Sequence, residues 1–311
     1  MRSRGTAAAV VALAILAAAC SGRRSPAAPT PPATPPAPVP GPGLSEPVTA
    51  MLLELPSYIA RALAENQANL PRNPHNAVQI QAKIAMLQNP SLAAEIIDGH
   101  FYVEGGVSSR NGRIIPVVAV FAREAMRAEA TDTVRSIELA LPVLENFMAT
   151  AFPRDVIRVW YGFIIGNRGG GGTLYMEDRT TYESRTSEGR LPYEAITDHE
   201  LAHSYISHEA LTQFLELYTY NMVHTGSADP RSWAFARSCV ALSSANEGVC
   251  ALLDVHLLIG PDAMAAAYAT VRGLNPPYGQ PLDPAVKQVF VDHAPAALKA
   301  EIAAKMDRVT Y

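Results

Sequence analysis

The 311-residue sequence has little charge and little cysteine: 17% of its residues are charged and only three are cysteine. A formal net charge of -4 and an isoelectric point near 6.1 give no basic surface, which argues against nucleic acid as a partner. There is no internal repeat and, after the first twenty residues, no hydrophobic run long enough to span a bilayer. With 49% apolar residues, the rest of the chain can bury a substantial core.

The N-terminus has the features of an export signal. Basic residues within 1–4 precede an apolar run over 7–19, and Cys20 follows. The segment 16–20 (LAAAC) resembles a bacterial lipoprotein signal, in which the cysteine becomes the lipid-modified first residue. Such signals more often have Leu three residues before the cysteine, and Leu16 is four before it, so an ordinary cleaved signal is the alternative. We therefore expect a signal peptide over 1–20, lipidation at Cys20, and a protein anchored in the cell envelope, on the periplasmic or cell-surface side.

Residues 21–47 are mostly Pro, Ala and Gly, a composition that favours extended chain and cannot bury enough apolar surface to fold. We expect a tether there and one folded domain over 48–311. Within that domain Cys239 and Cys250 are eleven residues apart, in a compartment where disulfides persist. They form either one disulfide or two buried thiols. Their spacing is not that of a cysteine zinc site.

The hydrophobic periodicity predicts helices first, then a strand-rich region, then helices only. Such segregation is typical of an α+β fold with two lobes and a cleft between them, rather than an alternating βαβ fold. Glycine-rich residues 167–172 are expected to be a turn or loop between two strands. The expected helices are 48–69, 77–87, 131–150, one from about 193, 210–223, 233–241, 244–259, 262–272 and 284–305, the last broken near Pro295, and the expected strands are 101–103, 114–121, 156–165 and 173–178.

The segment His199-Glu200-Leu201-Ala202-His203 (HELAH) is an instance of the H-E-x-x-H pattern. In a helix, residues four apart share one face, so the two imidazoles converge on one metal ion and Glu200 reaches a metal-bound water. This arrangement predicts a zinc hydrolase in which Glu200 is the general base. The alternative is an amphipathic helix whose histidines only form hydrogen bonds in the core.

A catalytic zinc usually has three protein ligands, and two residues are candidates for the third. Glu209 is the eleventh residue counted from His199, where metzincins place their third histidine, but Ile206 replaces the glycine that those enzymes have at the eighth position. The other candidate is Glu247, in Asn246-Glu247-Gly248. There the chain resembles the gluzincin peptidases, such as thermolysin and aminopeptidase N, in which a segment of this type supplies a glutamate ligand. The resemblance implies a zincin-like, two-lobed metallopeptidase fold: a mixed-sheet lobe, the active-site helix and an all-helical lobe.

The same resemblance, which covers about 90 residues, suggests further roles. Asp254 is a candidate to support a histidine ligand. Glu177, in Met176-Glu177-Asp178, is a candidate to bind a substrate's amino group, and its strand is expected to be the edge strand that lines the cleft. The transition state usually needs one more donor. We expect Tyr278 because it lies in a loop, with three other downstream residues as alternatives: Tyr268, His256 and His293.

These observations predict a zinc-dependent peptidase, anchored by lipid, that acts on a peptide or protein substrate. An alternative is a catalytically inactive zincin-fold lipoprotein that serves as a binding or assembly factor of the cell envelope. The presence of Glu200 argues against it, because a purely structural metal needs no base at that position. A third reading is a lipoprotein with no metal.

Overall fold

The computed structural model describes residues 44–185, 192–233 and 247–309. All of them belong to one compact unit, Ala37–Tyr311. The expected signal peptide, Cys20 and most of the expected tether lie outside the described residues. Helix α1 (Glu46–Asn69) begins inside the range expected for the tether, because the Ser45 hydroxyl accepts a hydrogen bond from the Val48 N–H at 3.4 Å and caps the first turn. Among the described residues, no helix is both long and apolar enough to cross a membrane.

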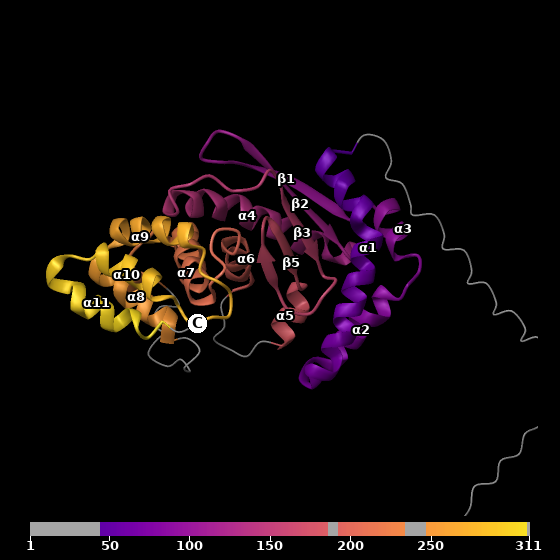
Figure 1. Ribbon diagram of the computed structural model, residues 1–311. Coiled ribbons are helices and arrows are strands. Elements are labelled where there is room, and N and C mark those ends of the chain that lie inside the picture. The colour runs from indigo at the N-terminus through magenta and orange to yellow at the C-terminus, as the bar shows by residue number, and fades with distance from the viewer. Residues whose placement is uncertain (1–43, 186–191, 234–246, 310–311) are drawn as a thin grey trace, which may run out of the picture. The chain divides into compact units, whose positions relative to one another are not determined.

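A mixed sheet forms the centre of the described structure (Figure 1). Its strands lie in the order β1-β2-β3-β5-β4. Strands β1 and β2 are an antiparallel hairpin, β3 runs parallel to both β2 and β5, and β4 is antiparallel to β5. The strand bounds are β1 Tyr102–Ser108, β2 Ile114–Phe121, β3 Ile157–Tyr161, β4 Arg168–Gly170 and β5 Thr173–Met176.

Helices cover both faces of the sheet, so its central strands are apolar on both sides. In β2, Val118 and Val120 pack with α1, α2 (Ala77–Leu87) and α3 (Leu92–Asp98). The alternate residues Val117 and Ala119 pack with α4 (Arg127–Phe147) and α6 (Tyr193–Ala202) on the other face. This two-sided burial explains why β2 is an almost continuous apolar run rather than an alternating one.

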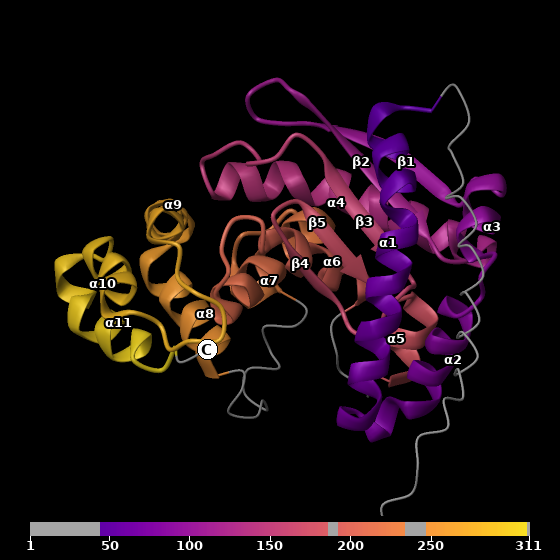
Figure 2. The same cartoon turned by 45° about the vertical axis from the view of Figure 1, so that its right-hand side comes forward.

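The chain after the sheet is helical, as Figure 2 shows. Helix α7 packs against α6, and the later helices extend away from the sheet on that side. Aromatic side chains of α4, α7 and α9 and aliphatic side chains of α8 fill the core between them, with Phe214 stacked on Tyr268 at 5.3 Å between ring centroids. The bounds are α7 Glu209–Thr225, α8 Glu247–Ile259, α9 Pro261–Leu274, α10 Pro284–Asp292 and α11 Lys299–Met306.

The expected α+β class, with a sheet lobe followed by helices, is confirmed. Two details of the sequence interpretation were wrong. Residues 168–170, expected to be a loop, form β4, because pairing with β5 overrides the low strand preference of glycine. As a result β5 lies inside the sheet, and β4 is the edge strand. Helices α3 and α5 (Arg179–Arg185) were not anticipated, whereas most of the expected helix 233–241 lies outside the described residues.

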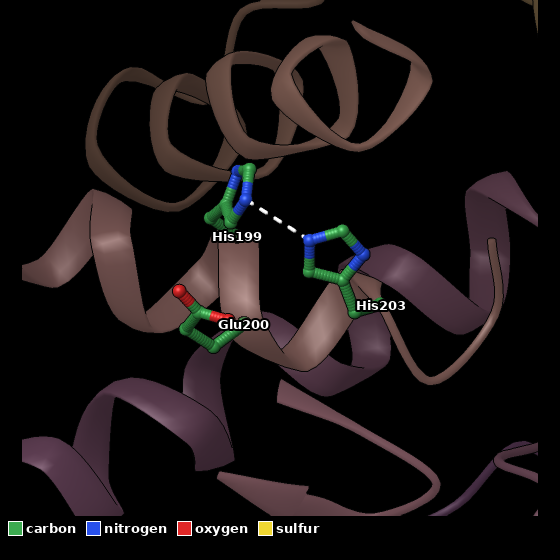
Figure 3. A group of neighbouring side chains, drawn as sticks. All are labelled: His199, Glu200 and His203. Atoms are coloured by element: carbon green, nitrogen blue, oxygen red, sulfur yellow. Dashed lines mark hydrogen bonds between the residues drawn. The ribbon is translucent and has the colours of Figure 1, made fainter. Parts of the chain in front are cut away.

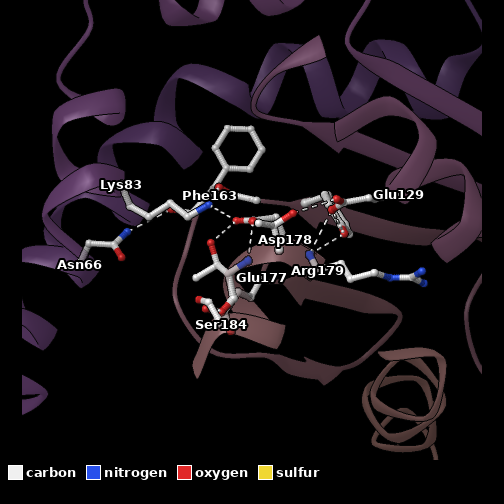
Figure 4. Close-up of polar contacts among 12 residues, drawn as sticks. Asn66, Lys83, Glu129, Phe163, Glu177, Asp178, Arg179 and Ser184 are labelled. Atoms are coloured by element: carbon white, nitrogen blue, oxygen red, sulfur yellow. Dashed lines mark hydrogen bonds and ion pairs between the residues drawn. The ribbon is translucent and has the colours of Figure 1, made fainter. Parts of the chain in front are cut away.

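A buried ion pair joins α2 to the end of β5 (Figure 4). The Lys83 ammonium contacts the Asp178 carboxylate and donates to the Gly162 carbonyl at 2.6 Å. Asp178 also accepts hydrogen bonds from the Thr181 N–H and hydroxyl, both at 2.9 Å. Every charge in this Lys83–Asp178 pair therefore has a partner, and the pair fixes where α5 begins.

Candidate metal centre

Helix α6 carries His199, and His203 is its C-cap, directly after the last helical residue Ala202 (Figure 3). The Nε2 atoms of His199 and His203 are 3.1 Å apart. With Glu200 these residues form a group whose ligand atoms all lie within 4.8 Å of one another, and such a group can hold a metal ion. The convergence expected from the spacing of four residues is therefore present.

The second nitrogen of each imidazole is occupied. Nδ1 of His199 is 3.0 Å from Oε2 of Glu216. Nδ1 of His203 is 3.3 Å from the Ile206 carbonyl, which can only accept a hydrogen bond. Both contacts favour the tautomer with hydrogen on Nδ1, and in that tautomer the Nε2 lone pairs of the two imidazoles face each other. Two facing lone pairs repel each other unless a proton or a cation lies between them.

Glu209 adds a carboxylate to the two nitrogens. Its Oε1 is 3.4 Å from Nε2 of His199, and its Oε2 is 3.5 Å from Nε2 of His203. In a tetrahedral zinc site with bonds of about 2.0–2.1 Å, neighbouring ligand atoms are separated by about 3.3 Å. The three separations of 3.1 to 3.5 Å are close to that value, with one Glu209 oxygen beside each histidine. Two imidazoles and one carboxylate are also a ligand set typical of catalytic zinc. The residues present therefore fit the metal.

Glu200 lies on the same turn with its carboxyl group buried, and its Oε2 has no hydrogen-bond partner among the described residues. Burial raises the pKa of Glu200 to about 8, although the charge of His199 opposes this shift. A carboxyl group that titrates near neutral pH is suited to take up and release a proton.

Acidic side chains surround the histidines. Burial raises the pKa of Glu216, and that of Asp198 well above its usual range. Burial would also raise the pKa of Glu209, but hydrogen bonds to both histidines outweigh it and lower that pKa. Burial disfavours charge on His199, yet the Glu216 carboxylate holds the pKa of His199 well above its usual value. We call His199, Glu200, His203, Glu209 and Glu216 the histidine centre; it attracts positive charge.

A pocket of about 540 Å³ opens over the histidine centre. One wall is the edge strand β4 and the turn after it; Gly169 lies so close to α6 that a Cβ atom there would stand 2.6 Å from the main-chain carbon of Glu200. Tyr278 also lines the pocket; it is 67% exposed, and its ring centroid is 6.1 Å from that of His203. The pocket is lined by residues 167–171, His199, Glu200, His203, Ser207, Glu209 and Tyr278.

The structure does not bring the expected Glu247 to the histidines. Glu247 is the exposed first residue of α8 and does not line the pocket; the carboxylate beside both Nε2 atoms belongs to Glu209. The tight reversal over 204–208 returns the chain to α6 within six residues and so places Glu209. Asp254 forms an ion pair with Lys305 at 2.9 Å, and the carboxylate that holds His199 is Glu216 instead.

Glu177 is fully buried and does not line the pocket. Its N–H donates to Asn167 at 2.8 Å, and its carbonyl accepts the Tyr193 hydroxyl. Of the four aromatic or histidine candidates for an additional donor, Tyr278 alone lines the pocket, whereas Tyr268, His256 and His293 bond to main-chain carbonyls elsewhere. Cys250 is disulfide-bonded, and its expected partner Cys239 lies outside the described residues.

Sequence reasoning missed Glu216 and Thr212. The Thr212 hydroxyl is 3.3 Å from Nδ1 of His203 and donates to the Ile206 carbonyl at 3.0 Å, so it supports the chain reversal over 204–208. Glu209, Thr212 and Glu216 are three and four residues apart, so they share one face of α7. Polar residues with this spacing, on a helix whose other buried side chains are mostly apolar, were the signal that could have found them.

No family profile matches the sequence, and no curated protein matches it. Solved structures similar to the chain include an M1 zinc metallopeptidase of Deinococcus radiodurans (17% identity, TM-score 0.47), its E323A mutant bound to a Tyr-Ser-Ala substrate (15%, 0.46), and a two-domain M1 zinc metallopeptidase E323A mutant bound to L-tryptophan (16%, 0.47). The matches cover 67–68% of this chain and 51–52% of those chains. Similarity at this level does not establish an activity, and the function proposed below rests on the geometry of the histidine centre.

Proposed function

We propose that the protein is a zinc-dependent peptidase in which His199, His203 and Glu209 hold the metal and Glu200 is the general base. The observation that carries the proposal is the convergence of two Nε2 lone pairs and one carboxylate at separations of 3.1–3.5 Å, with a buried carboxyl group beside them. A bound Zn²⁺ would lower the pKa of its water towards about 7 and polarise the substrate carbonyl.

The residues of the chain have separate tasks in this proposal. Glu200 takes the proton of the attacking water at its unpartnered Oε2 and returns it to the leaving amine. Glu216 and the Ile206 carbonyl hold the imidazoles with Nδ1 protonated, which leaves Nε2 free for the metal. The edge strand β4 offers main-chain groups to an extended peptide.

Tyr278 is proposed as the donor to the developing oxyanion. The charge of Glu209, followed by burial, raises the pKa of Tyr278, so its phenol keeps its proton at neutral pH. A protonated phenol at the edge of the pocket can donate a hydrogen bond that strengthens as negative charge develops.

The alternative, an inactive zincin-fold lipoprotein that acts as a binding or assembly factor, would not need Glu200 beside the histidines.

We further propose that the protein is exported and anchored by a lipid on Cys20. A Cys20→Ala variant should then move from the membrane fraction to the soluble fraction.

The decisive experiment combines zinc content with activity. Wild type should contain one zinc ion per chain and cleave members of a peptide library. Glu200→Gln should keep the zinc, because Glu200 is not a ligand, but lose about 10²–10⁴-fold in kcat/KM because the base is gone. Wild-type turnover by Glu200→Gln would refute the assigned base, and a folded wild type without zinc would refute the proposed function.

A further inference from the structure

The edge of the cleft carries a positive charge. Arg168 is the first residue of the edge strand β4 and lines the pocket. Its guanidinium forms a two-point ion pair with Glu65 of α1, one contact of which is 2.6 Å, and lies 4.5 Å from the centre of the Tyr175 ring. Two neighbours therefore hold the guanidinium in place.

The two partners of this ion pair are placed differently relative to the pocket. Its positive partner belongs to the strand that borders the cleft, and its negative partner belongs to the helix behind that strand and does not line the pocket. A substrate strand beside β4 consequently meets the positive end of the pair.

The described lining of the pocket offers no spare anion. Its only carboxylates are Glu200 and Glu209, which the proposed mechanism already uses as base and ligand. Glu177, the acid expected to bind an amino group, is fully buried. A free α-ammonium group placed beside β4 would therefore face a guanidinium rather than a carboxylate.

We propose that Arg168 makes the cleft select peptides that present a carboxylate, not an ammonium group, beside β4. This inference rests on the proposed peptidase function. The enzyme accordingly cleaves inside polypeptides, with an acidic side chain close to the scissile bond, and does not remove residues from free N-termini. The three glycines at 169–171 leave the rest of this wall without side chains, so Arg168 is the charged determinant on β4.

The test uses internally quenched peptides in which each position near the scissile bond is Glu, Gln or Lys in turn, with free or acetylated N-termini. At the most sensitive position, wild type should prefer Glu to Lys by about fivefold in kcat/KM, as expected for a partly exposed charge pair. Arg168→Gln should abolish the preference. The charge swap Arg168→Glu with Glu65→Arg keeps the ion pair and should reverse it.

The chain offers a matched control. Arg158 of β3 pairs with Glu54 of α1 at 3.5 Å, with similar exposure, but does not line the pocket. Arg158→Gln should leave the Glu-to-Lys ratio unchanged. An active Arg168→Gln enzyme with an unchanged Glu-to-Lys ratio would overturn this inference and leave the proposed peptidase function standing. Faster cleavage of peptides with free than with acetylated N-termini would do the same. Zinc-loaded wild type that cleaves no peptide would overturn the proposed function as well.

Discussion

The Lys83–Asp178 pair and the histidine centre are both buried and both charged, but their charges are balanced differently. Asp178 has Lys83 and two groups of Thr181 as partners. In the histidine centre no carboxylate pairs with Lys or Arg among the described residues, and Oε2 of Glu200 and Oε1 of Glu216 have no hydrogen-bond partner there. A buried carboxyl group without a partner is costly, so a cluster of such groups persists where a cation or a reaction requires it.

This difference in charge balance indicates a structural role for the Lys83–Asp178 pair and a functional role for the histidine centre. The Lys83–Asp178 pair joins α2 to the end of β5 and should matter for stability only. The histidine centre should matter for metal binding and turnover. Substitutions in the two groups should therefore have effects that do not overlap.

The largest expected effect is the loss of a metal ligand. Glu209→Ala removes the carboxylate whose oxygens lie 3.4 Å from Nε2 of His199 and 3.5 Å from Nε2 of His203, so the purified protein should contain much less than one zinc per chain and have no measurable activity. Elemental analysis checks this, with Glu247→Ala as the matched control, since Glu247 is exposed on α8. Zinc lost with Glu247→Ala and kept with Glu209→Ala would reverse the assignment and restore the ligand expected from the sequence.

The next effect should be on stability. Lys83→Met leaves the buried Asp178 carboxylate without its cation and should lower the free energy of unfolding by about 3–5 kcal/mol. Urea denaturation checks this, and zinc content should stay at the wild-type value while the protein is folded. In the double variant Lys83→Met with Asp178→Leu, no buried charge is left, so most of the loss should be recovered. A Lys83→Met variant that loses zinc but not stability would contradict the distinction.

A smaller effect is expected at Glu216. Replacing it with Gln weakens the hydrogen bond that orients His199 and should reduce zinc affinity by about 10–100-fold, as for other outer-shell carboxylates. Competition with a chelator measures the affinity. Asp254→Asn is the control, because that carboxylate pairs with Lys305 rather than with a histidine. Equal affinities in both variants would show that Glu216 does not position the ligand.

The smallest effect concerns pH. Burial acts to raise the pKa of Asp178, but Lys83 and Thr181 outweigh it, so the folded-state pKa lies below the usual value. A depressed pKa means that the stabilisation is complete above the unfolded-state pKa of about 3.9 and is lost as the pH falls through the folded-state pKa. The stability difference between wild type and Asp178→Asn should be constant from pH 7 to about 5 and shrink below about 4. A constant difference down to pH 2 would contradict this.

Local sequence was enough for part of the site. The spacing of four residues within one helix brings the two histidines together, and the helix periodicity gave α6 and α7 close to their observed bounds. The class of fold followed from the order of the elements. Each of these features depends on residues that are close in sequence.

The misplaced residues depend on contacts between distant elements. Residues 168–170 contain two glycines and form a strand only because β5 pairs with them. Glu177 was expected in the cleft, yet the inward position of β5 buries it. Both Glu209 and Glu247 have the right chemistry for a ligand, and nothing in their local sequence decides between them.

Local sequence alone places two imidazoles and one carboxyl group at one helical turn, because helix geometry fixes the positions of residues one and four apart. Tertiary packing selects which further carboxylates reach those imidazoles, since this depends on the reversal over 204–208 and on how α7 packs against α6. It also decided which strand borders the cleft and which charge that strand presents there, because strand order arises from pairing across the whole sheet.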